Sequence, residues 1–263
     1  IPANTLPLDA NMQIMAKFEI GDGNFDIEVG VDPDYEALEM KVGSYINAEG
    51  KVVRDAADAV GIVFKMEAIG DDVPANYPVA LQGKTIAGYA VAIENVVVGR
   101  QTLNNEAISS LVTTDATVTN GTQATEALLT GLGDVAFKTT YEKWVNEHLL
   151  DGESLSSWYI PTLNQLGEFM GMLFKVGEVE PTGGQAFREM PEFAFENGVM
   201  FDRDPIESVY YASCTVNGSK DVSGVIINVD KTTKQVLDAK ASSLKVTGSS
   251  QKALCRPMIT IFK

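Results

Sequence analysis

The residue types that most often carry chemistry are sparse in this sequence. His148 is the only histidine, and Cys214 and Cys255 are the only cysteines. The cysteines lie outside any CxxC pattern, and a single histidine does not complete the ligand set of a zinc site. We therefore expect no bound metal and no cofactor. The two cysteines have apolar neighbours, so one structural disulfide and two buried thiols are both compatible with the pattern.

His148 falls on an apolar stripe with Phe137, Tyr141 and Trp144 at helical spacing, which predicts a helix over residues 134–149. No serine, cysteine or carboxylate near it in the sequence suggests a catalytic partner, so we expect it to be a residue at the edge of the core. No nucleophile–base set or carboxylate pair is evident elsewhere in the chain. The sequence thus predicts a protein that is not an enzyme.

The charge of the chain narrows the classes of partner. It carries 20 basic and 36 acidic residues, a net charge of −16. So acidic a chain is a poor partner for nucleic acid or for an anionic membrane surface. Its longest apolar region, residues 86–98, is interrupted by Glu94 and Asn95 and is too short to span a bilayer. We expect neither nucleic-acid binding nor membrane insertion.

The N-terminal region shows a strand-like alternation of apolar and polar residues. Ile14, Ala16, Phe18 and Ile20 would share one strand face, and a second alternating run follows the turn signal at residues 21–24. Residues 12–32 are therefore predicted to form a β-hairpin with one apolar face. Because an isolated hairpin is marginally stable, that face needs cover from the main domain or from another subunit. We interpret residues 1–39 as an arm and a hairpin that serve docking or assembly.

A second informative stretch runs from Trp158 to Phe174. The aromatic and β-branched residues Trp158, Tyr159 and Ile160 precede Pro161, which cannot continue a central strand. Thr162 followed by Gln165 is typical of a capping box, so a helix is predicted over residues 162–174. The remaining pattern predicts a hairpin at 40–53, buried strands at 61–66 and 86–98, a polar loop at 67–84, a short helix at 123–129 capped by Thr122, strands at 209–215, 222–229 and 254–262, and a loop at 241–252.

Several of these pieces, in this order, resemble a known family. The motifs are Val42 to Gly50, Gly61-Ile62-Val63-Phe64, Gly88 to Ile93, Asn120-Gly121-Thr122-Gln123-Ala124-Thr125, Trp158-Tyr159-Ile160-Pro161-Thr162, Tyr210-Tyr211-Ala212-Ser213 and Arg256-Pro257-Met258. Together they resemble the C-type-lectin-like domains of surface and fimbria-associated proteins from gut Bacteroidetes and Fibrobacter relatives. The match departs at Ser44, Tyr211 and Ala212, where the family more often has Asp, Trp and Ser.

The resemblance implies an α+β fold over residues 40–263. Two helices would flank a small twisted antiparallel sheet, and the last strand would close the domain near its start. The N-terminal β-hairpin would be an extension outside this C-type-lectin-like fold. Many relatives have a disulfide that ties the sheet to the long loop or to the last strand, so the resemblance also implies a possible Cys214–Cys255 bridge.

The resemblance further implies a non-catalytic binding module, an adhesin-like surface or secreted protein that recognises a carbohydrate or protein ligand. We expect C-terminal loops and strand ends to supply the contacts, because polar residues there have no obvious structural duty. The candidate ligand-binding residues are Tyr211, Thr215, Asn217, Ser219, Asn228 and Asp230. The calcium-dependent sugar motifs Glu-Pro-Asn and Trp-Asn-Asp are absent from the sequence. The expected location is extracellular or at the cell surface.

Two other hypotheses follow from proteins that share this fold. Phages use it in receptor-binding and fibre proteins of the virion, often as trimers, and the hairpin at 12–32 could then be the element of a homotrimer. The second hypothesis is an enzyme, because a formylglycine-generating oxidase shares this fold and binds copper through two cysteines that are close in sequence. Cys214 and Cys255, in contrast, lie 41 positions apart. The enzyme hypothesis is therefore the weaker of the two.

Overall fold

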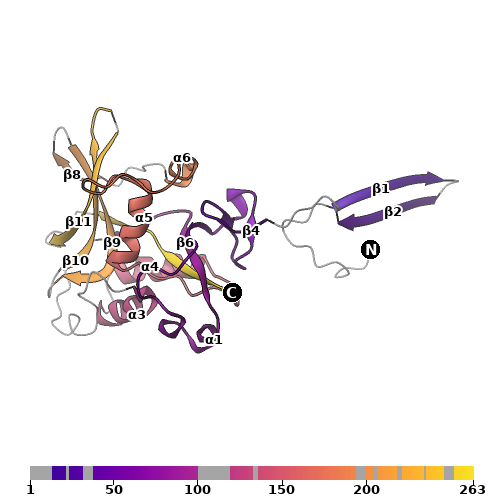
Figure 1. Cartoon of the computed structure of the whole chain (residues 1–263), viewed down its shortest axis with the longest axis horizontal. Helices are drawn as coiled ribbons and strands as arrows, with labels where there is room; N and C mark the ends of the chain where they lie inside the picture. The colour runs from indigo at the N-terminus through magenta and orange to yellow at the C-terminus, as the bar shows by residue number, and fades with distance from the viewer. Residues whose placement is uncertain are drawn as a thin grey trace.

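The computed structural model describes residues 14–21, 24–31, 38–99, 119–132, 136–193, 199–203, 206–217, 221–233, 235–245 and 252–263. Within these ranges the chain is of mixed α+β class, as the sequence predicts. The described strands form three sheets, and the longer helices pack on those of the main body (Figure 1).

The predicted N-terminal hairpin is confirmed. β1 (Ile14–Gly21) pairs antiparallel with β2 (Asn24–Val31), so that Ile14, Ala16, Phe18 and Ile20 stand opposite Val31, Val29, Ile27 and Phe25. Apolar positions are therefore matched with apolar positions on alternate rungs. Neither strand pairs with any other described strand, and Figure 1 shows the hairpin apart from the main body.

One sheet joins the beginning of the main body to its end. Its strand order is β13-β6-β5-β3-β4, with β3 (Tyr45–Ile46), β4 (Val52–Val53), β5 (Gly61–Lys65), β6 (Ile86–Ala92) and β13 (Met258–Phe262). The hairpin expected at 40–53 is present with shorter strands. β13 runs antiparallel to β6, and the backbones of Thr85 and Lys263 exchange two hydrogen bonds of 2.9 Å. The last strand thus closes the sheet.

The other large sheet has the order β11-β10-β9-β12-β7, and β8 also pairs with β9. Its strands are β7 (Val96–Gly99), β8 (Val199–Arg203), β9 (Ile206–Asn217), β10 (Asp221–Asp230), β11 (Val236–Lys245) and β12 (Lys252–Cys255). β12 pairs parallel with β9 through Leu254 and Tyr211. The expected single, small, antiparallel sheet is therefore wrong in extent and in this pairing.

Two strand predictions are corrected in this region. The run at 86–98 is divided between β6 and β7, which belong to different sheets, and the interruption falls at Glu94 and Asn95. The predicted strand at 254–262 is divided between β12 and β13 at Pro257, which has no backbone N–H to donate. β11 occupies part of the expected loop at 241–252, because pairing with β10 overrides its Ser- and Lys-rich composition.

The helices match the prediction more closely. α3 (Gly121–Leu132), α4 (Ala136–Glu147) and α5 (Leu163–Leu173) are the longer described helices, and α1 (Val79–Gln82) and α6 (Gln185–Arg188) are single turns. Short 3-10 turns lie at Ala56–Asp58, Pro74–Asn76 and Pro191–Phe193. The capping box is confirmed: Thr162 Oγ1 accepts from Gln165 N, and Gln165 Oε1 accepts from Thr162 N at 3.1 Å.

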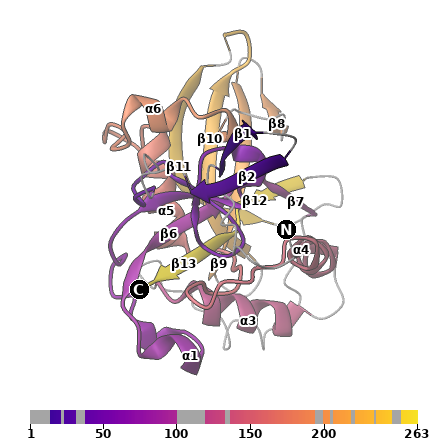
Figure 2. The same ribbon diagram turned by 90° about the vertical axis from the view of Figure 1, so that its right-hand side faces the viewer.

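Buried side chains among the described residues fall into two clusters. α3 and α4 contribute to one cluster, and α5 contributes to the other. Figure 2 shows α3 and α4 near each other, with α5 apart from them. Successive residues of β6 alternate between them, with Ala90 in the α3–α4 cluster and Tyr89 and Val91 in the α5 cluster. Because a strand buried on both faces needs apolar residues throughout, β6 reads as a continuous apolar run.

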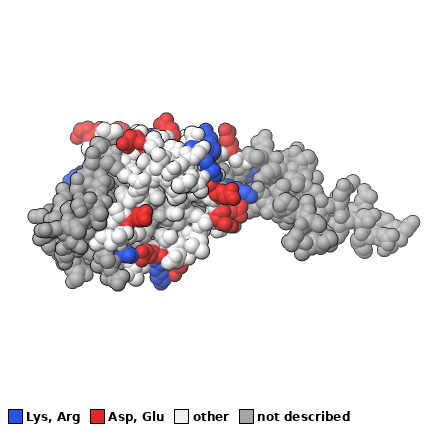
Figure 3. All heavy atoms as spheres, turned by 90° about the horizontal axis from the view of Figure 1, so that it is seen from below, with Lys and Arg blue, Asp and Glu red and all other residues white. Residues whose placement is uncertain are grey.

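Most of the described surface visible in Figure 3 is uncharged, and acidic and basic side chains are scattered over it. In Figure 3, Lys and Arg lie between Asp and Glu on the visible face and do not form a separate basic patch. None of the helices within the described residues combines the length and the apolar character needed to cross a membrane.

Candidate functional site

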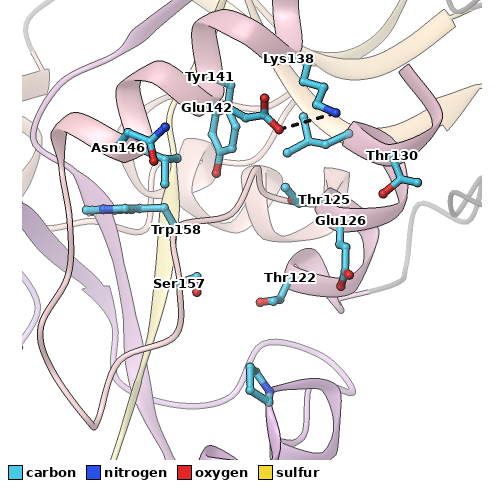
Figure 4. A pocket seen from close by; sticks show the side chains of 13 residues that line it. Thr122, Thr125, Glu126, Thr130, Lys138, Tyr141, Glu142, Asn146, Ser157 and Trp158 are labelled. Carbon is cyan, nitrogen blue, oxygen red and sulfur yellow. Dashed lines mark ion pairs between the residues drawn. The ribbon is translucent and has the colours of Figure 1, made fainter. Parts of the chain in front are cut away.

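The candidate site is a pocket of about 580 Å³ between α3 and α4, closed on a third side by Ser157 and Trp158 (Figure 4). Its volume falls within the roughly 300–1,000 Å³ typical of small-molecule sites. The lining residues are Pro78, Thr122, Thr125, Glu126, Leu129, Thr130, Lys138, Tyr141, Glu142, Val145, Asn146, Ser157 and Trp158. The pocket therefore combines two aromatic rings with hydroxyl, amide and charged groups.

The aromatic wall is held rigidly. Trp158 is 5% exposed, and its Nε1 donates to the backbone oxygen of His148 at 2.7 Å. Its ring meets Trp144 edge to face, with 5.2 Å between the ring centroids. Trp144 Nε1 in turn donates to Glu94 Oε1 at 2.6 Å. Both indoles thus have fixed orientations, which reduces the entropy lost when a ligand is bound.

Two hydroxyl groups of the pocket are buried without a hydrogen-bond partner among the described residues, those of Tyr141 and Thr122. Tyr141 is 2% exposed, and burial, together with the nearby thiols Cys255 and Cys214, raises the pKa of its phenol well above the usual range. Figure 4 shows the ring of Tyr141 directed between Trp158 and Thr125. A buried hydroxyl left unpaired costs about 1–3 kcal/mol, so a ligand that pairs with it would recover that free energy.

Charged groups stand at the edge of the pocket. Lys138 Nζ lies 3.7 Å from Glu142 Oε1, an i,i+4 pair on α4. Glu126 on α3 is exposed and forms no ion pair with any described residue. The two carboxylates outnumber the one ammonium group, so the pocket favours a neutral or cationic ligand over an anionic one.

α3 is positioned by its first two turns. Gly121 packs so closely on Tyr159 that a Cβ there would lie 2.5 Å from the ring carbon Cδ2. One turn later, Thr125 Oγ1 accepts from Ile160 N at 2.9 Å and donates to Ile160 O at 3.0 Å. The helix begins at Gly121, so the prediction that Thr122 caps it is wrong: Thr122 lies in the first turn.

His148 lies beside the pocket at the edge of the core, as predicted. Its ring stacks on Trp144 with 4.2 Å between centroids, and its Nε2 is 3.2 Å from Glu94 Oε1. Its Nδ1 is 2.8 Å from the backbone oxygen of Trp144. These contacts give His148 a packing role at the C-terminal end of α4.

Three of the predicted ligand-binding residues have structural roles. Thr215 is buried and its Oγ1 accepts from Leu163 N at 2.9 Å, at the start of α5. Asn228 accepts from Ser208 Oγ at 2.7 Å and also bonds to Asp238, linking β9, β10 and β11. Asp230 Oδ1 accepts from the backbone N–H groups of two turn residues, which lowers the pKa of its carboxyl group. The expectation that these three residues lack structural duties is therefore wrong; their roles towards a ligand stay predictions.

The other candidates are more dispersed. The Tyr211 hydroxyl accepts from Asn95 Nδ2 at 3.3 Å, and its ring packs against the α5 cluster. Asn217 ends β9, and Ser219 lies outside the described residues. None of the six residues lines the α3–α4 pocket. The sequence did not reveal this pocket because Tyr141 and Trp158 look like core residues, and nothing in the spacing places Glu126 opposite Glu142.

Cys214 in β9 and Cys255 in β12 are free and fully buried. They lie on neighbouring strands in the α3–α4 cluster, close to the pocket residues Tyr141 and Thr125. Burial raises the pKa of Cys214 to about 12 and raises that of Cys255 further. Of the two alternatives left by the sequence, the structure has two buried thiols.

Within the described residues, no cluster of three His, Cys, Asp or Glu side chains is placed to hold a metal ion. Neither a family model nor a curated protein nor a solved structure matches the chain.

Proposed function

We propose that this chain is a non-catalytic binding module, an adhesin-like surface or secreted protein that recognises a carbohydrate or protein, and that its ligand occupies the α3–α4 pocket. The observation that carries the proposal is the pocket itself, with fixed aromatic rings beside two unpaired, buried hydroxyl groups. We also propose that residues 40–263 form a C-type-lectin-like domain. The α+β class and the closure by β13 beside β6 support this finer assignment.

A binding role suits the pocket better than hydrolysis. A glycosidase needs a carboxylic acid that burial keeps protonated, next to a second carboxylate. Glu126 and Glu142 are both exposed, and Glu142 pairs with Lys138. An incubation with saccharide probes that released reducing ends would contradict the non-catalytic proposal.

The binding proposal is tested on a glycan array and a panel of host surface proteins. The Ser157→Tyr variant places a bulky ring at an exposed position of the pocket, and the exposed Glu178→Tyr variant, outside the pocket, is the matched control. We expect ligand retention to fall at least about tenfold in Ser157→Tyr alone, because the ring occupies the ligand volume. Retention that is equal in both variants would place the ligand elsewhere. Retention lost on adding a chelator would overturn the calcium-independent part of the proposal.

The alternative proposal is a phage receptor-binding or fibre protein that forms a homotrimer. The observation that favours it is the register of β1 and β2, which matches apolar positions along the whole hairpin. Light scattering of residues 1–263 and of residues 40–263 separates the proposals. A trimer that becomes a monomer without residues 1–39 supports assembly through the hairpin. A monomer in both cases rules out the trimer.

A further inference from the structure

We propose that the α3–α4 pocket binds a saccharide that carries a free amino group, and that Glu126 is the partner of that amine. This inference rests on the proposed binding function and names the ligand class for the same site. It starts from the difference between the two carboxylates. Lys138 balances Glu142 at 3.7 Å, whereas Glu126 forms no ion pair with a described residue.

The interior of the pocket suits a pyranose ring. Such a ring has an apolar C–H face and a rim of hydroxyl groups, each of which donates and accepts hydrogen bonds. Leu129 and Val145, both partly exposed, supply apolar surface beside Trp158 and Tyr141, and the buried hydroxyls of Tyr141 and Thr122 have no partner among the described residues. A sugar hydroxyl that reached either of them would remove the cost of leaving it unsatisfied.

The side chains on the mouth of the pocket add selectivity. Figure 4 shows Glu126 on the α3 side and Glu142, with its ion pair to Lys138, on the α4 side. An ammonium group on the ligand would find an uncompensated carboxylate at Glu126 and form a charge-assisted hydrogen bond. A sugar acid would instead meet the excess negative charge of the pocket and of a chain with net charge −16.

A peptide is a less suitable ligand for this site. Peptides are usually recognised along a free strand edge, in a long apolar groove, or on an aromatic-lined groove that accepts an extended chain. The walls here come largely from α3 and α4, whose internal backbone groups are already bonded within each helix. Recognition must therefore come from side chains, and these are rich in hydroxyl groups.

The test uses the fluorescence of the two tryptophans, because Trp158 lines the pocket and Trp144 contacts it. The full chain is titrated at about pH 6, where a sugar amine is protonated, with tetramers of glucosamine, of N-acetylglucosamine and of glucose, and with trilysine. We expect the glucosamine tetramer to bind about fivefold more tightly than the other two sugars. In Glu126→Gln this preference should disappear while the binding of the glucose tetramer is retained. Glu178→Gln, an exposed carboxylate outside the pocket, should behave like the wild type.

The outcomes separate this inference from the proposed function. Equal binding of the three sugars, or an amine preference that persists in Glu126→Gln, overturns the inference and leaves the binding module in place. Trilysine binding without sugar binding likewise overturns the inference in favour of a peptide ligand. If none of the four probes binds, the inference fails and the glycan array remains the test of the proposed function. If Ser157→Tyr binds the glucosamine tetramer as the wild type does, the assignment of the ligand to this pocket fails as well.

Discussion

The side chain of Thr125 bonds to both backbone groups of Ile160. Its Oγ1 accepts from Ile160 N at 2.9 Å and donates to Ile160 O at 3.0 Å. Ile160 lies two residues after Trp158 and directly before Pro161, so this contact attaches α3 to the segment that forms the aromatic wall. One threonine thus connects the helix of the pocket with the junction that precedes α5.

This contact predicts a large effect for an isosteric change. In Thr125→Val the buried N–H and C=O groups of Ile160 lose their partner, and we expect the free energy of unfolding to fall by about 3 kcal/mol. Thr130→Val, at an exposed position of the same helix, should change it by less than about 0.5 kcal/mol. Urea denaturation of both variants measures the difference. A loss below about 1 kcal/mol in Thr125→Val would mean that water replaces the hydroxyl.

Alanine substitutions at Gly121 and Gly167 should change the stability of the fold in opposite directions. A Cβ at Gly121 would lie 2.5 Å from Tyr159 Cδ2, so Gly121→Ala should destabilise the fold by about 1–3 kcal/mol. Nothing lies within 4 Å of a Cβ at Gly167 in α5, so Gly167→Ala should stabilise it by about 0.5–1 kcal/mol through helix propensity. Thermal unfolding shows both signs. A neutral Gly121→Ala would indicate that α3 can shift away from Tyr159.

Asp72 is expected to make the fold more stable as the pH falls, which is the opposite of the usual effect of a carboxylate. Its carboxylate accepts from the hydroxyls of Tyr77 and Tyr89 and from Asn76 Nδ2, but burial outweighs these bonds and raises its pKa. The folded state therefore binds the proton more tightly than the unfolded state does. Stability contributed by this group is lower at neutral pH and rises as the pH falls through the folded-state pKa.

The comparison with Asp72→Asn, which does not titrate, isolates this effect. We expect the stability of the wild type relative to Asp72→Asn to increase between pH 7 and about 4.5. Asp58→Asn, at an exposed carboxylate, should show no comparable change. Urea titrations at several pH values provide the measurement. A wild-type advantage that shrinks on acidification would mean that the tyrosine hydroxyls stabilise the carboxylate more than burial opposes it.

The parts of the fold that local rules determine could be predicted. The capping box of Thr162 and Gln165 and the alternation in β1 and β2 are properties of neighbouring residues, and both are confirmed. The order Asn-Gly-x-x-x-Thr at residues 120–125 now has a physical reason, because Gly121 approaches Tyr159 and Thr125 bonds to Ile160.

The parts that depend on distant contacts could not be predicted. β11 forms because β10 supplies a pairing edge, and Asp72 is buried because Tyr89 of β6 covers it together with Tyr77 of its own segment, although residues 67–84 look like a polar loop. The pocket has the same origin. Its walls come from α3, α4 and residues 157–158, and no local pattern indicates that these segments leave a space between them.

The two cysteines should be unreactive in the folded protein. Both are fully buried, and burial raises the pKa of Cys214 to about 12 and raises the pKa of Cys255 as well. Because the thiolate is the reactive form, a thiol reagent at about pH 8 should modify neither residue in the native state. Both should react after unfolding in guanidinium chloride. No reactive thiol after unfolding would show a Cys214–Cys255 disulfide instead.

The same burial predicts a loss of stability in alkali. A raised pKa means that the folded state holds the thiol proton more tightly than the unfolded state does. The stability that the buried thiol contributes is therefore fully present below about pH 9 and declines as the pH rises towards 12. Denaturation curves at pH 7, 9 and about 10.5 should show the decline. Cys214→Ala should be less stable at pH 7, because it leaves a cavity, but should lose less between pH 9 and 10.5 than the wild type. An equal alkaline loss in both proteins would assign the effect to the buried tyrosines, whose pKa values burial also raises.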